Sequence, residues 1–168
     1  MADVSKLAPL ILKWEGGYAN DKDDKGGCTM KGVTIAVFRK YYGNYKTCND
    51  LKNITDTQWL HILKTGYWDK MKADQIENQS IANLCVQMCW GSGPVTAIKK
   101  IQSCLGTNPD GIVGQKTLAL LNAPNRKATF DKLWNMRRAW FMNIAKVGNN
   151  QKFLKGWLNR LNDYKFYE

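Results

Sequence analysis

Histidine is almost absent from the sequence, and its scarcity excludes several kinds of site. His61 is the only histidine among 168 residues, and it falls within a helical pattern of apolar residues. A Ser–His or Cys–His nucleophilic pair would have to use this residue, whose position favours an ordinary, partly exposed place on a helix. The five cysteines include no Cys-x-x-Cys pair. We therefore expect no metal site and no other cofactor.

Long apolar segments are also missing. No run approaches the ~18 residues that a membrane-spanning helix needs, and the stretch 7–12 is short and interrupted by Pro9. The N-terminal residues 1–6 are not basic and lead into no long apolar centre with a cleavage site. We expect no membrane insertion and no signal peptide, so a substrate outside the cytoplasm requires another export route.

Acidic residues are few relative to basic ones. The chain has 25 Lys and Arg against 14 Asp and Glu, which gives a net charge of +11. Such a positive field concentrates polyanions, whether nucleic acid, an anionic membrane or a bacterial wall with carboxylates and phosphates. The basic residues are spread along the chain and form no basic arm, so a solvated positive surface is favoured over a nucleic-acid groove.

The cysteines show no disulfide framework. Their number is odd, and Cys85 and Cys89 lie four residues apart on an apolar helical pattern. Free thiols in such positions behave as small hydrophobic side chains. We expect these two to be core residues and the chain to fold in a reducing compartment.

Helical periodicity dominates the remaining pattern, and strand-like alternation is nearly absent. Helices are predicted over 5–15, 33–42, 74–90, 114–121 and 126–147, with others after Thr55, from Pro94 and after Gly148. The Gly- and Asp-rich residues 18–32 predict a loop or short hairpin. The fold class is therefore mainly α, with a small loop or β-hairpin region after the first helix. The break at 91–93 predicts two regions, 1–92 and 93–168, packed against each other.

Glu15 is the strongest candidate for chemistry. It is the last residue of the first apolar helix and precedes Gly16-Gly17. The partial negative charge of a helix C-terminus disfavours a carboxylate there, and apolar surroundings from Trp14 and Tyr18 act in the same direction. A carboxyl group that keeps its proton is what a general acid for glycosidic cleavage requires. On spacing alone, a surface glutamate at a helix end explains the residue equally well.

A second carboxylate is expected from the loop that follows, at Asp21, Asp23 or Asp24. Two carboxyl groups about 5–5.5 Å apart predict a retaining glycosidase, whereas about 6.5–9.5 Å predicts an inverting one. For each aspartate alone, a solvated turn residue is the better explanation. Sugars offer apolar faces to aromatic rings, so a saccharide groove is predicted to be lined from Tyr18, Tyr41, Tyr42, Tyr67 and Trp68. The tryptophans at 59, 134, 140 and 157 fit apolar stripes and are expected in the core.

An ordered set of motifs runs through nearly the whole chain. E-G-G-Y occupies 15–18 and D-K-G-G-C-T-M-K-G-V-T occupies 24–34, followed by Tyr67-Trp68 and by W-G-S-G at 90–93. The later segments are K-K-I-Q-S-C-L-G, D-G-I-V-G-Q-K-T-L and F-L-K-G-W-L-N-R. The set resembles the glycoside hydrolase family 108 lysozymes, and its second part resembles the peptidoglycan-binding region usually fused behind their catalytic half.

The resemblance implies a lysozyme-like fold and N-acetylmuramidase activity on the β-1,4 bond between N-acetylmuramic acid and N-acetylglucosamine. The family's catalytic glutamate falls on Glu15 and the Asp of its D-x-G-G motif on Asp24, while Tyr18 and Thr29 match motif positions near the cleft. It further implies peptidoglycan glycan strands as the partner of a monomer. Such proteins are phage lysins or prophage-linked wall enzymes, for which release through a holin is an expected route.

One position departs from the family pattern. Many relatives carry an Asp before the mid-chain glycines where this chain has Gln87. This difference motivates an alternative, a non-catalytic wall-binding protein that kept the fold and lost turnover. A basic nucleic-acid binder is the remaining alternative, supported only by the net charge and by no recognition motif.

Overall fold

The computed structural model describes residues 1–23 and 25–168 and is mainly helical, with one two-stranded antiparallel hairpin after the first helix. This confirms the predicted fold class. The main helices are α1 (Val4–Trp14), α2 (Ile35–Tyr42), α3 (Cys48–Lys52), α4 (Asp56–Leu63), α5 (Gln79–Ser92), α6 (Pro94–Leu105), α7 (Gln115–Leu121), α8 (Arg126–Ala145) and α9 (Leu154–Asn162). Shorter helical turns are the π-helical η1 (Lys64–Trp68) and the 3-10 helices η2 (Ala73–Gln75) and η3 (Asn150–Phe153).

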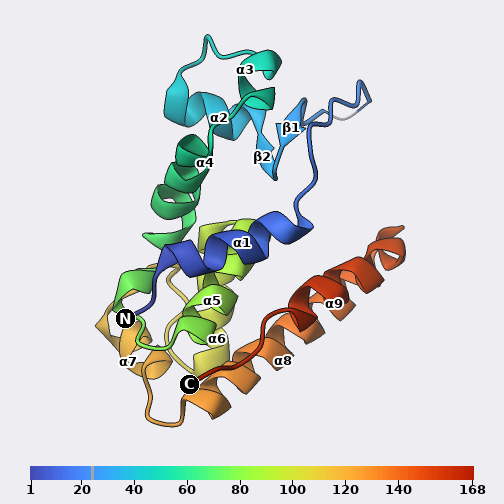
Figure 1. Cartoon of the computed structure of the whole chain (residues 1–168). Helices are drawn as coiled ribbons and strands as arrows, with labels where there is room; N and C mark the ends of the chain where they lie inside the picture. Colours follow the sequence, from blue (N-terminus) through green and yellow to red (C-terminus); the bar gives the residue numbers. More distant parts are fainter. Residues whose placement is uncertain (24) are drawn as a thin grey trace.

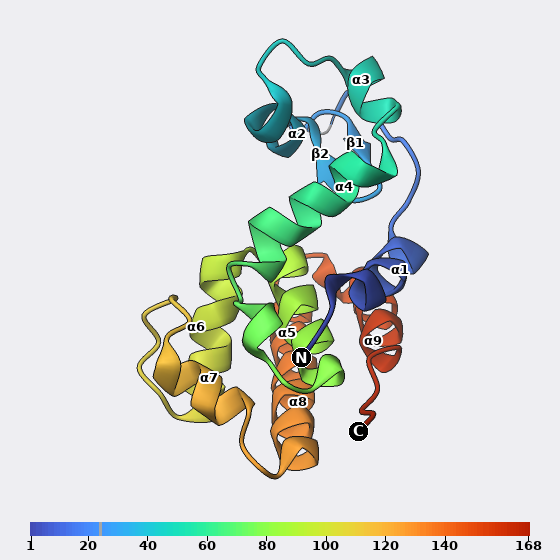
Figure 2. The same cartoon turned by 60° about the vertical axis from the view of Figure 1, so that its left-hand side comes forward.

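The elements form two unequal lobes. The hairpin of β1 (Thr29–Met30) and β2 (Val33–Thr34), together with α2 and α3, makes a small lobe at the top of Figures 1 and 2. The larger lobe contains α1 and the helices from α5 onward, and α4 connects the two. The hairpin pairs Thr29 with Thr34 and Met30 with Val33. The end of α1 faces the small lobe, so residue 15 lies at the border between the lobes.

Helix α5 is the central element of the larger lobe. Its residues 80–86, 88 and 89 are buried, which matches a helix covered on most of its circumference. Asn78 caps it by accepting a hydrogen bond from the backbone N–H of Ile81. The predicted start at residue 74 was too early, because 73–75 form a separate 3-10 turn before this cap.

The apolar core continues past the end of α5. Gly93 adopts φ +84°, which lets the chain turn directly into α6, and Pro94 takes the first helical position as predicted. Helix α5 packs against both α6 and α8, and one cluster of buried apolar residues extends from Ala2 to Tyr164. Across residues 1–23 and 25–168, no helix has both the length and the apolar character needed to cross a bilayer.

The C-terminal segment holds the end of α1. The Asp163 carboxylate accepts hydrogen bonds from Lys13 Nζ at 2.8 Å and from the Trp14 indole N–H at 2.5 Å. The hydrogen bond from Lys13, supported by the one from Trp14, lowers the pKa of Asp163 below its usual value of 3.8. The residue before Glu15 is thereby fixed by a contact about 150 positions away along the chain.

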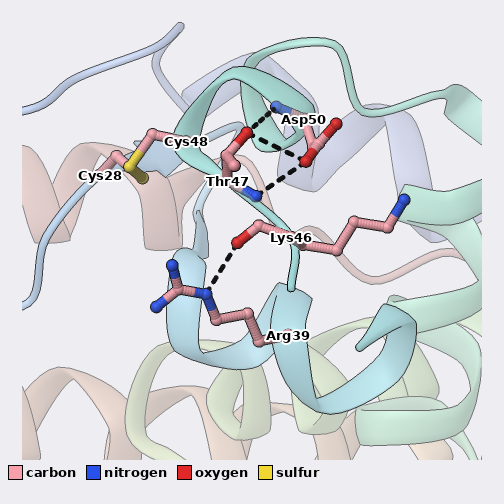
Figure 3. The surroundings of a disulfide bond; sticks show 6 residues. All are labelled: Cys28, Arg39, Lys46, Thr47, Cys48 and Asp50. Carbon is pink, nitrogen blue, oxygen red and sulfur yellow. Dashed lines mark hydrogen bonds between the residues drawn. A yellow bond between two sulfur atoms is a disulfide. The ribbon is translucent and has the colours of Figure 1, made fainter. Parts of the chain in front are cut away.

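A disulfide ties the small lobe together (Figure 3). Cys28 and Cys48 are bonded, with 5.9 Å between their Cα atoms and a sequence separation of 20. The bond connects the start of the hairpin to α3, whose first turn is fixed by a capping box between Thr47 and Asp50. This finding removes our argument for a reducing compartment, because the argument assumed thiols throughout.

The cysteines predicted in the core behave as expected. Cys85 and Cys89 are free and buried, and Cys104 is free and half-buried. Burial raises the pKa of the Cys89 thiol to about 12. At neutral pH this group is therefore an uncharged thiol within the apolar core.

We predict that the disulfide stabilises the fold through loop closure. Replacing Cys28 and Cys48 together by Ser should lower the free energy of unfolding by about 3 kcal/mol, the value expected for a loop of this size. Denaturant unfolding measures the difference, with Cys104→Ser as the matched control because Cys104 is unpaired. Equal midpoints for the double variant and the control would show that the bond contributes nothing.

We predict a pH-dependent contribution from Asp163. Its pKa is lowered in the folded state, so its stabilisation is present above the unfolded pKa and is lost as the pH falls through the folded pKa. Asp163→Asn should lower the free energy of unfolding by about 1 kcal/mol at pH 7, and the loss should fade below about pH 4. The control, Asp131→Asn, removes only an exposed helical ion pair with Lys127. A loss for Asp163→Asn that stays constant down to about pH 2 would contradict this account.

Candidate active site

Glu15 is positioned by the end of α1. Its backbone N–H donates to the carbonyl oxygens of Ile11 and Leu12, at 3.2 and 3.3 Å, and its own backbone is extended. The next residue, Gly16, accepts a hydrogen bond of 3.0 Å from the backbone N–H of Lys31 in the hairpin turn. The glutamate therefore lies where the helix stops and the chain is tied to the small lobe.

The Glu15 carboxyl group is enclosed by contacts from two distant segments. The indole N–H of Trp90 on α5 donates to Glu15 Oε1 at 3.0 Å. On another side lies Gly32, whose φ is +79°, and a Cβ added there would lie 2.6 Å from Glu15 Cδ and Oε2. The same Cβ would lie 3.0 Å from the Trp90 ring. Only glycine leaves room for this arrangement.

Aromatic rings fix the Trp90 side chain. Its ring centroid lies 4.8 Å from that of Tyr67 and 5.6 Å from that of Trp59. Trp59 is 2% exposed, which confirms it as a core residue, and its indole N–H donates to the Lys31 carbonyl at 2.9 Å. The same cluster therefore restrains both the hairpin turn and the tryptophan that holds Glu15.

Glu15 opens onto a pocket between α1, α5 and α9. The walls are mainly apolar, with an acid, an amide, a phenol and a guanidinium among them: Leu10, Ile11, Trp14, Glu15, Gln87, Trp90, Gly91, Arg160 and Tyr164. Burial raises the pKa of Tyr164, so its phenol is neutral at ordinary pH. Gln87 Oε1 is buried and accepts no hydrogen bond from the described residues.

Tyr67, a predicted sugar contact, lies next to Trp90. It belongs to the π-helical turn η1, is half-buried, and packs on Trp90. Burial raises the pKa of its phenol. Single π-helical turns are rare and frequently occur at functional sites, because they displace one side chain from the regular helical positions.

Tyr18 and Thr29 lie on the small lobe. Tyr18 is 36% exposed and its ring lies 5.5 Å below the Lys52 ammonium. Thr29 begins β1 and also forms a bridge with Ala19. Both residues belong to the segment that returns from Glu15 into the hairpin.

Trp68 does not line a groove, contrary to our prediction. It is 0% exposed, and its indole N–H donates to Asp74 Oδ1 at 2.6 Å. A side chain without exposed surface cannot stack on a sugar. Tyr41 and Tyr42 are half-buried, and the Tyr42 hydroxyl donates to the Gln58 carbonyl. His61 is exposed on its helix and packs edge-on to Tyr41.

The candidate second carboxylates lie in the loop after Tyr18. Asp21 and Asp23 are exposed, and Asp21 Oδ1 accepts a hydrogen bond from the Asp23 backbone N–H at 2.9 Å. This is the turn geometry that the sequence offered as the simpler explanation. Asp24, our predicted partner for Glu15, lies outside the described residues.

Two residues of the site had no role in the sequence-based prediction. Trp90 belongs to the motif W-G-S-G, and Gly32 belongs to the motif D-K-G-G-C-T-M-K-G-V-T, but neither motif indicated a role for these residues. Motif membership was the available signal, since a glycine within a hairpin turn indicates close approach of another group. No local pattern indicates that either contacts Glu15.

Two family models match consecutive parts of the chain. The first is described as glycosyl hydrolase 108 and covers residues 8–93, and the second as a predicted peptidoglycan domain covering residues 96–162. The first match includes Glu15, Gly32 and Trp90. The second includes the pocket residue Arg160.

The chain is also similar in structure to a solved protein, described as SagA of Brucella abortus. The similarity has a TM-score of 0.81 at 28% sequence identity, and it covers 96% of this chain and 90% of the other. No functionally curated protein matches the chain. Because the first family model covers more than half of the chain and contains the Glu15 site, the protein belongs to the glycosyl hydrolase 108 family and is a glycoside hydrolase.

Proposed function

We propose that the protein is an N-acetylmuramidase that hydrolyses the β-1,4 bond between N-acetylmuramic acid and N-acetylglucosamine in peptidoglycan, with Glu15 as general acid. The hydrogen bond from Trp90 to Glu15 carries this proposal. It restrains a carboxyl group that lines a pocket with mainly apolar walls and lies against Gly32 of the small lobe. The peptidoglycan domain that follows supports the choice of substrate.

In the proposed chemistry, the two carboxyl oxygens of Glu15 have different roles. The Trp90 N–H occupies Oε1, so Oε1 serves as the acceptor and Oε2 carries the proton. Oε2 gives that proton to the glycosidic oxygen as the bond to the sugar carbon breaks. After cleavage Glu15 is a carboxylate, and the indole N–H stabilises its negative charge. A proton from the water molecule that attacks the sugar carbon restores the acid.

A second carboxylate completes the proposed reaction. The sugar carbon develops positive, oxocarbenium-like character, and an anionic group on its other face stabilises it or orients the attacking water. We assign this role to Asp24, on the match between its D-x-G-G motif and that of the family. Tyr18, Thr29 and Tyr67 are the proposed sugar contacts. Trp68 is left out of this set because it is fully buried.

The proposed partner is the glycan strand of the bacterial wall, bound by a monomer. The net charge of +11 supports this, because wall polymers carry carboxylates and phosphates. The disulfide supports action outside the reducing cytoplasm. We propose a lysin-type role in which the protein reaches the wall after release by a holin or a comparable route.

Replacing the proton donor tests the mechanism. Glu15→Gln keeps the acceptor for Trp90 but cannot donate the proton, so the rate of wall digestion should fall by about 10²–10⁴-fold. The measurement is the release of new reducing-end muramic acid from purified sacculi. Glu168→Gln, at the exposed C-terminus, is the matched control and should retain the wild-type rate.

Four other outcomes would each contradict the proposal in a different way. Equal rates for wild type and Glu15→Gln would remove Glu15 from the mechanism. New reducing-end glucosamine would identify the other glycosidic bond, and new amino termini would identify a peptidase or amidase. Binding of sacculi without release of soluble fragments would favour a non-catalytic wall-binding protein.

Gly32 offers a second test, because it limits the space around the Glu15 carboxyl. In Gly32→Ala the new Cβ would lie 2.6 Å from that carboxyl, so the acid must move and the rate should fall by roughly 10²-fold. The positive φ should also lower the free energy of unfolding by about 1 kcal/mol or more. Gly17→Ala is the matched control, since no atom lies within 4 Å of its added Cβ. A Gly32→Ala enzyme as active as this control would show that the close approach is unimportant.

A further inference from the structure

Arg137 is a buried cation in the middle of α8. Its side chain is 1% exposed, although its neighbour Arg138 on the same helix is exposed. It forms no ion pair with any Asp or Glu of the described chain. Its Nε is buried and makes no hydrogen bond to the described residues. A buried charge is normally paired, so this residue requires a specific explanation.

The guanidinium contacts lie at the C-terminal end of α5. Nη1 donates to Ser92 Oγ at 3.1 Å, and Ser92 is the last residue of that helix. Nη2 lies against Gly91, where an added Cβ would be only 3.0 Å away. A cation at a helix C-terminus interacts favourably with the partial negative charge of the helix. The charge of Arg137 is therefore directed at the last turn of α5.

Two aromatic rings also contact the guanidinium. Its central carbon lies 4.3 Å from the ring centroid of Trp140 and 4.0 Å from that of Phe141. Desolvation lowers the Arg137 pKa to about 10, so the group is still a cation at neutral pH. The rings and the helix end together replace part of its lost hydration.

We propose that Arg137 is a positioning residue of the active site, which fixes the last turn of α5 so that the Trp90 indole reaches Glu15. This inference rests on the proposed function of Glu15. It also gives a role to each of the first three residues of W-G-S-G. Trp90 bonds Glu15, Gly91 leaves room for the guanidinium, and Ser92 accepts its hydrogen bond. Arg137 lies within the second family match, so the C-terminal region acts on the catalytic acid.

The first experiment compares Arg137→Met with Arg138→Met. The same substitution one residue apart removes either the buried cation or an exposed one. Arg137→Met should lower kcat on soluble glycan fragments roughly tenfold while KM stays within about twofold, because positioning is lost and substrate contacts are kept. Arg138→Met should leave both constants unchanged. An unchanged kcat in folded Arg137→Met would overturn the proposal.

A double-mutant cycle with Trp90→Phe separates positioning from general packing. If Arg137 acts through the indole N–H, Arg137→Met should cost less than about twofold in kcat once that N–H is absent. A residue that merely supports the fold would give the same tenfold loss in both backgrounds, and this result would refute the inference.

Fluorine NMR tests the same contact without relying on activity. In protein labelled with 5-fluorotryptophan, Trp90 is assigned from the signal lost in Trp90→Phe. Arg137→Met should move that signal, whereas Arg138→Met should not. If Glu15→Gln proves fully active, the proposed function fails, and this readout still decides whether Arg137 positions Trp90. An unmoved Trp90 signal rejects the positioning role on its own.

Smaller changes cover the case in which Arg137→Met does not fold. Ser92→Ala removes the acceptor, and Gly91→Ala pushes on Nη2. Both should lower kcat while KM changes less. Both should also move the Trp90 signal in the same direction as Arg137→Met does. Wild-type kcat in both folded variants would count against the proposal.

Discussion

The hydrogen bond between Trp90 and Glu15 is the contact on which the rest of the site depends. Glu15 follows the end of α1 in an extended conformation, so its own helix does not fix its carboxyl group. The restraint comes from an indole 75 positions later in the chain and from the bare backbone of Gly32. One such hydrogen bond contributes only about 1–3 kcal/mol. The geometry of this hydrogen bond therefore depends on how firmly α1 and α5 are held in place.

This dependence explains why α5 is so deeply buried. A helix that presents a catalytic contact must not shift relative to α1, and burial among close-packed neighbours resists such shifts. Helices α6 and α8 supply those neighbours, while Asp163 fixes Trp14 at the end of α1. The C-terminal region thus contributes to the geometry of the acid, whatever its own affinity for peptidoglycan.

Local pattern predicted the main helices except α3, and it placed Glu15 at the end of the first helix, because these features depend on residues close together in sequence. Residues 33–34, which were predicted to start a helix, form β2 instead. Local pattern failed where contacts between distant parts of the sequence determine the structure. Trp68 was placed with Tyr67 because they are adjacent, yet the π-helical turn leaves one half-exposed at the site and the other buried on Asp74. The disulfide was missed because its two cysteines are 20 positions apart in a sequence that shows no pairing pattern. The sequence identified Trp90 and Gly32 only as members of motifs and predicted no role for either.

The disulfide restrains the hairpin that contacts Glu15. The small lobe, from β1 to the end of α3, spans only residues 29–52, a size at which apolar burial alone rarely holds a fold. Cys28 immediately precedes β1, so the bond restrains the hairpin that brings Gly32 against Glu15. Such a bond persists in oxidising surroundings and is reduced in most cytoplasms. The hairpin, and with it the Glu15 side chain, is therefore held most firmly in oxidising surroundings.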